Sequence, residues 1–411
     1  MDVVHERAAG MDISKRDAKV AIRVPGKRAG TFTTSVTTWG ATTGQVLELI
    51  EFLHAQRVTT VVMEATSDYW KPFYFLMEDT LPVMLVNARQ ARNIPGRKTD
   101  VSDAAWLAQL AAHGLLRASF VPPEPVRQLR DLTRARAIAV RDRTRHVQRL
   151  EKFLESSGIK LSSVVSGLTG ASSRAMLDAL VSGERDPQML AGLAKGTLRN
   201  KIPQLIDALQ GRFTEHHARM VGEYLTQIDT ATAMIDRLTE WIEEAIAPFR
   251  SVRDALITIP GVSVSVADVI IAETGGDMGV FETPGRLASW AGVCPGQNES
   301  AGRVKSSQTR PGDKYLKAAL GVAALSASRS KGTYLAARYR RIASRRGPIK
   351  AVVAIEHTIL IAVWHMLRNG EVYADPGGDF YTRTAPDKTK NKAIRQLENL
   401  GYEVVITPVA A

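Results

Sequence analysis

Cysteine is nearly absent from this sequence, which has one, Cys294, among 411 residues. A single cysteine cannot form an internal disulfide or a zinc site of several thiolates, so the cysteine content gives no indication of secretion. The first residues lack a basic segment followed by an apolar one, which argues against a signal peptide. The most apolar stretch, 351–366, is interrupted by Glu356 and His357 and is too short to span a bilayer. We therefore expect a soluble, cytoplasmic protein with no membrane partner.

Acidic residues are too few to balance the basic ones. Lys and Arg total 54 against 42 Asp and Glu, which gives a net charge of +12 and a pI near 9.8. Such an excess favours a polyanionic partner, nucleic acid before a membrane surface, although a merely basic protein is the simpler alternative. With 411 residues, the chain has room for two or three domains.

Residues 1–118 are expected to form an α/β domain. Closely spaced β-prone runs with turn residues between them indicate an antiparallel meander, and the later apolar runs alternate with helical patterns. The predicted strands lie at 9–13, 18–24, 31–37, 59–63 and 83–86, and the predicted helices at 43–54, 70–77 and 101–115. This order gives a mixed sheet with helices on its faces, and open sheets of that kind bind ligands beyond the carboxyl ends of their parallel strands.

A Pro-rich break at 121–125 precedes a change of composition. We expect residues 119–250 to form a helical spacer, with an Arg-rich helix over 127–152 and helical pieces at 173–181 and 201–209. Apolar residues from Val221 to Ile242 repeat at three-, four- and seven-residue steps, which predicts a long amphipathic or coiled-coil helix. This stripe suits an interface between protomers and a hairpin within one chain equally well.

Residues 251–370 are expected to form a smaller, mostly helical domain, followed by a linker and tail over 371–411. The predicted helices lie at 265–273, 283–291, 314–327, 332–344 and 350–367, with a loop rich in Gly, Ser and Pro at 292–312. Beyond them we expect a linker over 370–390, a helix at 392–400 and a strand at 403–407. The turn at 259–263 resembles a helix–hairpin–helix turn, which offers backbone N–H groups to a DNA phosphate, but a plain turn between helices fits equally.

Four carboxylates are candidates for a metal site. Asp12 ends the first predicted strand, Glu64 ends the first parallel strand, and Asp100 and Asp103 stand three residues apart at a helix start. If the two strands are neighbours, all four meet at one sheet edge, where carboxylate oxygens suit Mg²⁺ or Mn²⁺. Such ions orient and stabilise an in-line displacement at phosphorus. Taken singly, each acid is more simply a helix cap, a solvated strand end or a turn residue.

A serine and several cations are candidates for further sites. Ser300 lies in the flexible segment 294–303, where its hydroxyl is exposed beside a positive field, although an alcohol needs a base, a metal or a cation to become a nucleophile. Two basic stretches lie along the Arg-rich helix and, with interleaved tyrosines, near residue 340. They are better explained as polyanion-binding surfaces than as solvated helix faces. The candidate nucleic-acid contacts are Arg127, Arg130, Arg134, Arg141, Arg145, Arg149, Arg303, Lys305, Arg310, Arg338, Arg341 and Arg345.

The order of these motifs resembles the insertion-sequence-110 family of bacterial DEDD transposases. Asp12 in GMDISK, Glu64 in MEAT, and Asp100 and Asp103 in KTDVSDA match its four acids, and IPGVS followed by GVCPGQNESAG resembles its second domain. The resemblance implies a ribonuclease-H-like (Holliday-junction-resolvase-like) domain, then a long helical or coiled-coil spacer and a smaller, mostly α C-terminal transposase domain. It also implies that the acids hold Mg²⁺ and that Ser300 is the nucleophile.

The resemblance further implies a transient phosphoserine link to DNA, completed by the metal site of a second protomer. It implies guidance by a structured noncoding bridge RNA that pairs with donor and target DNA, and a homo-oligomer, dimer or tetramer, in the bacterial nucleoid. Two alternatives remain open from the residues themselves. One is a metal-dependent DNA nuclease or junction resolvase that uses only the acids and water. The other is a non-enzymatic nucleic-acid-binding protein.

Overall fold

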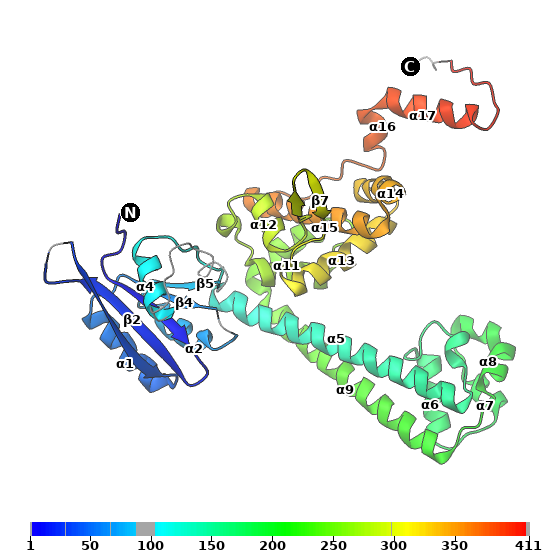
Figure 1. Ribbon diagram of the computed structural model, residues 1–411. Coiled ribbons are helices and arrows are strands. Elements are labelled where there is room, and N and C mark those ends of the chain that lie inside the picture. The colour runs from blue at the N-terminus through cyan, green and yellow to red at the C-terminus, as the bar shows by residue number, and fades with distance from the viewer. Residues whose placement is uncertain (1, 29, 66, 88–102, 297, 408–411) are drawn as a thin grey trace. The chain divides into compact units, whose positions relative to one another are not determined.

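Figure 1 shows the computed structural model, which describes the chain except for residues 1, 29, 66, 88–102, 297 and 408–411. The chain divides into two compact units, Met1–Val121 and Pro122–Ala411. The first unit is α/β, and the second is almost entirely helical where it is described. The chain is therefore a mixed sheet with helices followed by a mostly helical remainder.

The first unit contains a five-stranded mixed sheet with the order β3-β2-β1-β4-β5. Strand β1 pairs antiparallel with β2 and parallel with β4, and β4 pairs parallel with β5. The predicted meander, continued by β–α crossovers, is confirmed, with boundaries that differ by a few residues. The strands are β1 (Ala8–Ile13), β2 (Asp17–Pro25), β3 (Phe32–Gly40), β4 (Thr60–Glu64) and β5 (Val83–Val86).

Helices cover both faces of this sheet. On one face, Met11 and Met63 pack with Leu49 of α1 (Thr43–Ala55) and Phe73 of α2 (Trp70–Met77). On the other face, Val62 packs with Leu107 and Leu110 of α4 (Asp103–Ala112). Because successive strand residues alternate between the faces, even-numbered residues of β1 and β4 lie on the side of α4.

Two long helices form an antiparallel pair in the second unit (Figure 1). They are α5 (Glu124–Ser157) and α9 (Glu215–Ala245). Pro125 lies in the first turn of α5, where a missing N–H costs little, and Gly158 ends the helix in the left-handed conformation, with φ of 79°. The apolar stripe predicted from Val221 to Ile242 is buried along α9. The described chain thus uses the stripe for packing within itself.

A small helical lobe joins the far ends of α5 and α9. It contains α6 (Ala171–Val181), α7 (Pro187–Gly192) and α8 (Ile202–Leu209), with short 3-10 turns at Leu161–Ser163 and Gly196–Lys201. Leu150, Met176, Leu205 and Val221 are all fully buried members of one core that includes this lobe. The lobe therefore has its own hydrophobic core at the end of the helix pair.

The rest of the second unit is a helical bundle. Its longest helix, α15 (Pro348–Asn369), is long and apolar enough to cross a membrane by length and composition alone. It packs against α12 (Pro284–Trp290), α13 (Lys314–Arg329) and α14 (Tyr334–Arg346) as the central helix of a domain does. The bundle helices are α10 (Arg250–Leu256), α11 (Val264–Thr274), α12 (Pro284–Trp290), α13 (Lys314–Arg329), α14 (Tyr334–Arg346) and α15 (Pro348–Asn369), with 3-10 turns at Ala247–Phe249 and Met278–Val280.

Three local predictions differ from the structure. The loop predicted over 292–312 contains a hairpin of β6 (Asn298–Ser300) and β7 (Arg303–Ser306). The predicted linker over 370–390 contains α16 (Phe380–Thr384) and the start of α17 (Pro386–Glu398). The strand predicted at 403–407 is wrong, because these residues have no regular structure and a strand needs a partner to saturate its backbone groups.

Candidate catalytic and nucleic-acid-binding sites

Asp12 and Glu64 lie side by side at the carboxyl ends of two parallel strands. The register of β1 and β4 pairs Gly10 with Val62 and Met11 with Met63, so the next residues on each strand are Asp12 and Glu64. Both carboxylates are even-numbered and project toward the face covered by α4. Neighbouring strands are about 4.8 Å apart, which brings the two side chains within reach of one ligand. The sequence prediction that these two acids are neighbours thus has direct support in the register.

Gly10 explains how Asp103 comes to this face. A Cβ atom at Gly10 would lie 2.2 Å from the carbonyl oxygen of Ala104 and 2.4 Å from the amide nitrogen of Ala108, so the backbone of α4 crosses the strand directly over Gly10. Asp103, the first residue of α4, precedes Ala104 and is half-buried. An acid in the first turn also complements the helix dipole. Three of the predicted acids therefore share one face of the sheet.

The residue types fit a hard divalent cation, since every predicted ligand is a carboxylate. The fourth acid, Asp100, lies outside the described residues. Within the described part of the chain, no three His, Cys, Asp or Glu side chains are close enough to hold a metal ion together. The site is thus defined by donor chemistry and by a shared face, and the ligand geometry stays a prediction.

Lys19 is a neighbour of these acids that the sequence alone does not reveal. It lies opposite Asp12 in the antiparallel pairing of β1 and β2, and its side chain is exposed. Directly paired residues project to the same face with Cβ atoms about 5 Å apart. Lys19 therefore puts a positive charge beside the carboxylates. Its proximity to Asp12 can be recognised only from the register of the β1–β2 pair.

Ser300 is the last residue of β6, at the tip of a β-hairpin. It pairs with Arg303 across the two-residue turn Ala301-Gly302. Both turn residues have positive φ, 52° for Ala301 and 73° for Gly302, as in the type I′ turns that match the twist of paired strands. Positive φ strains a residue with a Cβ atom, so Ala301 stores strain next to the serine. Ser300 is exposed there, flanked by the exposed cations Arg303 and Lys305.

The base of this hairpin is held tightly against α12 and α13. Pro295 forms a β-bridge with Thr309, and the hydroxyl of Thr309 accepts a hydrogen bond of 2.8 Å from Nζ of Lys317 on α13. Gly292 and Gly312 permit the close approach, because a Cβ atom on Gly292 would lie 2.8 Å from the carbonyl oxygen of Arg310. The glycines of the predicted loop thus serve packing at its base as well as the turn at its tip.

The turn at 259–263 packs against α13. Gly261 has φ of 91°, and a Cβ atom there would lie 2.3 Å from the carbonyl oxygen of Ala323. The Ser263 hydroxyl accepts a hydrogen bond from the amide of Val266 and caps α11. Gly261 is therefore required for helix packing, which is the role of a plain turn between helices.

Two of the predicted nucleic-acid contacts are engaged inside the second unit. Arg134 donates two hydrogen bonds, of 2.8 and 2.7 Å, to the carboxylate of Glu273, whose side chain has no exposed surface. Arg130 lies 3.2 Å from the same carboxylate and donates to the carbonyl oxygens of Ala272 and Glu273. Burial raises the pKa of the Glu273 carboxyl, and the two guanidinium groups oppose this rise. We therefore assign Arg130 and Arg134 to holding α5 against α11 and no longer to a nucleic-acid surface.

The other predicted arginines of α5 differ in their surroundings. Arg127 donates to the carbonyl oxygen of Pro122, and Arg145 forms an exposed ion pair of 3.0 Å with Asp142. Arg141 is exposed and lies 5.8 Å from the ring of Tyr315. Arg149 is exposed and has no ion pair or hydrogen bond with any described side chain. The free cations of α5 thus lie toward its carboxyl end.

The basic stretch on α14 is partly covered by the tail. Arg338 donates to the hydroxyl groups of Tyr334 and Tyr381, at 3.1 and 3.4 Å, and Arg341 lies 4.3 Å from the ring of Tyr381 on α16. Arg345 is exposed and bonds only to the carbonyl oxygen of Arg341 among described residues. Of the three, Arg345 keeps its charge most available to a partner.

Comparison with known proteins gives matches over both units. A model for the DEDD group of IS110 transposases matches residues 9–158, and a model described as transposase IS116/IS110/IS902 family matches residues 253–340. The insertion element IS900 uncharacterized 42 kDa protein of Mycobacterium paratuberculosis is 30% identical over 299 residues, which cover 67% of this chain and 73% of that protein. The protein named "Putative transposase y4pF/y4sB" of Sinorhizobium fredii is 24% identical over 348 residues, 82% of this chain and 79% of that protein.

Proposed function

This chain belongs to the IS110/IS116/IS902 family of transposases, and from that premise we propose that it cuts and rejoins DNA through a covalent phosphoserine intermediate at Ser300. The acids Asp12, Glu64, Asp100 and Asp103 hold Mg²⁺ or Mn²⁺ in this proposal. The observation that carries it is the placement of Asp12 and Glu64 at adjacent ends of parallel strands, with Asp103 on the same face.

The serine performs the strand exchange in the proposed reaction. Its Oγ forms a bond to phosphorus while the bond from phosphorus to a deoxyribose oxygen breaks. The hydroxyl proton passes to a basic group of the assembled centre, and the released deoxyribose oxygen takes up a proton. A hydroxyl group of another strand then attacks the phosphoserine and restores Ser300. The number of phosphoester bonds is unchanged, so no external energy source is needed.

Other residues position the reacting groups. The paired turn of the hairpin presents Ser300 at its tip, and Arg303 and Lys305 attract the DNA backbone to it. A divalent ion bound by the acids would stabilise charge on the phosphoryl oxygens. Lys19, beside Asp12 in the register, adds a positive charge on the same face. The serine and the acids belong to different units of the chain, so we propose that the centre is assembled, with the acids supplied by a second protomer.

Two kinds of nucleic acid are proposed as partners. Donor and target DNA bind near the serine, and a structured noncoding RNA binds basic surfaces and selects the DNA by pairing. Exposed cations on α5 and α14, such as Arg149 and Arg345, support a polyanion contact. Guidance by RNA rests on family membership together with these surfaces.

The test is trapping of protein–DNA adducts on a denaturing gel. The full chain is incubated with Mg²⁺, donor and target duplexes, and RNA transcribed from the noncoding DNA that flanks the gene. We expect Ser300→Ala to abolish adducts, while Ser307→Ala, which changes an exposed serine just after β7, keeps them. Cleavage by Ser300→Ala at the rate of the unmodified protein would show that water is the nucleophile. Adducts of equal yield without the RNA would reject guidance.

A further inference from the structure

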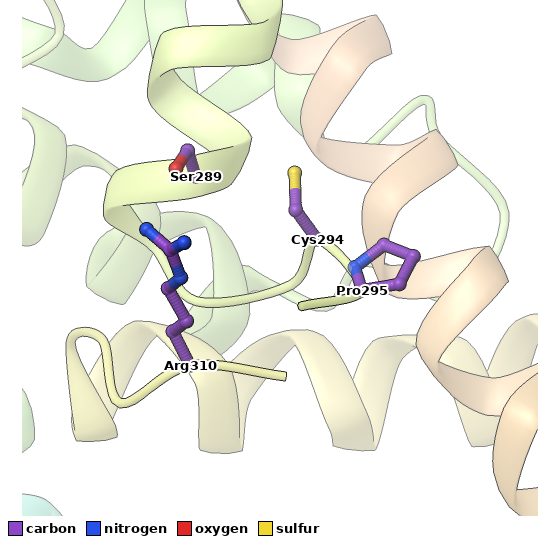
Figure 2. A pocket seen from close by; sticks show the side chains of 4 residues that line it. All are labelled: Ser289, Cys294, Pro295 and Arg310. Carbon is purple, nitrogen blue, oxygen red and sulfur yellow. The ribbon is translucent and has the colours of Figure 1, made fainter. Parts of the chain in front are cut away.

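A cavity of about 190 Å³ lies at the base of the hairpin that carries Ser300. It is lined by Ser289 on α12, Cys294 and Pro295 on the first arm of the hairpin, and Arg310 beyond the second arm. Figure 2 shows these four side chains around the open space, with the guanidinium of Arg310 extending toward Ser289. The volume equals that of about six waters of the liquid, so the cavity has room for a ligand group larger than one bound water.

The backbone builds this cavity. Gly292 and Gly312 pack so closely that a Cβ atom on Gly312 would lie 2.4 Å from the carbonyl carbon of Ala291. The crossing fixes Arg310 opposite the carboxyl end of α12, where Ser289 lies. The bridge between Pro295 and Thr309 closes the side toward the hairpin tip. The cavity therefore lies at the base of the same hairpin that presents Ser300 at its tip.

Its polar groups are suited to an anion. Neither the guanidinium of Arg310 nor the hydroxyl of Ser289 has a hydrogen bond or ion pair with any described residue. No carboxylate lines the cavity, so nothing in its described wall neutralises the arginine. A guanidinium and a hydroxyl are the groups that proteins commonly direct to phosphate oxygens of nucleic acids.

The cavity is too far from the serine to hold the phosphate under attack. Pro295 pairs with Thr309 at the base of the hairpin, whereas Ser300 pairs with Arg303 at its tip. The cavity thus suits a backbone phosphate other than the one that Ser300 attacks.

We propose that this cavity is a subsite for one backbone phosphate of the DNA strand cut by Ser300, held by the guanidinium of Arg310 and the hydroxyl of Ser289. The subsite deepens the proposed function and rests on it. By fixing a phosphate outside the reaction centre, it sets the register of the strand along the hairpin. Such a contact carries no base specificity, so a duplex of arbitrary sequence occupies it.

Cys294 makes occupancy measurable, because it is the single cysteine of the sequence and lines the cavity. The full chain is treated with a maleimide at mildly alkaline pH, since burial raises the pKa of the Cys294 thiol. Labelling rates are compared for protein alone, with a DNA duplex and with a duplex RNA of the same length. We expect DNA to slow labelling of the unmodified chain. Protection by RNA but not by DNA would overturn the assignment of the strand.

Two variants separate the subsite from general attraction to DNA. Arg310→Ala is expected to lose the protection and to lower the slope of log affinity against log salt by about 0.9, the value for one phosphate contact. Arg286→Ala removes an exposed arginine of α12 that pairs with Glu282 outside the cavity. This variant should keep both the protection of Cys294 and the salt slope of the unmodified chain. Equal protection in Arg310→Ala, or none in the unmodified chain while DNA binds, would overturn the subsite.

A third variant distinguishes failure of the subsite from failure of the proposed function. Ser300→Ala should keep the protection of Cys294, because occupancy does not need the covalent step. If the unmodified chain forms no adducts but Cys294 is protected through Arg310, the phosphate subsite stands and the phosphoserine mechanism is rejected. Thermal unfolding of each variant, compared with the unmodified chain, identifies any change in the labelling rate of Cys294 that comes from misfolding.

Discussion

Arg134→Ala should unfold the second unit more easily without first weakening nucleic-acid binding. Its guanidinium forms two hydrogen bonds with Glu273, whose side chain is fully buried, and a further contact of 3.4 Å with Asp313. Asp313 accepts hydrogen bonds from the amides of Tyr315 and Leu316 and so caps α13. Removal of the arginine leaves a buried carboxylate with fewer partners and loosens the segment that follows the hairpin.

The expected cost follows from these contacts. Removing one partner of a buried ion pair costs about 3–5 kcal/mol. Arg130 remains 3.2 Å from Glu273, and the side chain of Arg134 is 34% exposed, so we expect a cost somewhat below that range, about 2–3 kcal/mol. For a unit of this size that corresponds to a fall in melting temperature of roughly 4–12 °C. Arg134→Lys keeps the charge but loses the paired hydrogen bonds of the guanidinium, so it should lower the free energy of unfolding by less than Arg134→Ala does.

The assay is urea unfolding followed by hydrogen exchange of the α11 amides, with DNA affinity measured in parallel. Arg149→Ala is the matched control, because Arg149 is an exposed residue of the same helix. It should leave the unfolding midpoint unchanged and lower the affinity for DNA or RNA. The reasoning is refuted if Arg134→Ala unfolds like the unmodified chain and weakens binding as much as Arg149→Ala does.

Further predictions concern the acid-bearing sheet, the junction of α5, α9 and α11, and the serine hairpin. Gly10→Ala places a Cβ atom 2.2 Å from the carbonyl oxygen of Ala104, so it should displace α4 and abolish Mg²⁺-dependent cleavage, while Gly44→Ala, which meets no atom within 4 Å, should keep cleavage. Burial raises the pKa of Asp268 to about 6. The unfolded state, in which the pKa of an aspartate is about 3.9, binds the proton less tightly than the folded state does. The free energy of unfolding therefore falls as pH rises from about 4 to 6. Asp268→Asn should remove that decline and raise the urea midpoint at pH 7.5. Asp254→Asn, at an exposed position, should leave both the pH dependence and the urea midpoint unchanged. Ala301→Gly relieves the positive φ of 52° and should raise the melting temperature slightly without lowering the adduct yield; a fall in adduct yield at unchanged stability would mean that strain in the turn is used in catalysis.

The sheet was predictable because its signals are local. Runs such as 59–63 and 83–86 are short, β-branched and bounded by turns, and the structure forms β4 and β5 there. The placement of Asp12 and Glu64 at the ends of neighbouring strands also followed from the sequence, since parallel neighbours end at one edge. The positions of strand ends, which depend on local signals, were therefore accessible from the sequence, and the roles of the residues there stay predictions.

The roles of the arginines were not accessible in this way. Arg134 reaches Glu273, which is 139 residues further along the chain, and no periodicity within α5 distinguishes it from Arg149. The hairpin at 298–306 was hidden for a similar reason, because its Gly- and Ser-rich composition also describes an irregular loop. A glycine following Ala301 was the available signal for a two-residue turn.

The length of α5 has a mechanical consequence. Its 34 residues extend about 51 Å at 1.5 Å per residue, with the ion pairs to Glu273 near one end and the small lobe of α6, α7 and α8 at the other. From Arg134 to the end of α5 at Ser157 the helix extends about 35 Å, so a tilt of one degree about Arg134 would move that end by about 0.6 Å. The contacts of Arg130 and Arg134 with Glu273 therefore fix the direction of α5, and any angular change at these contacts would be amplified at the lobe.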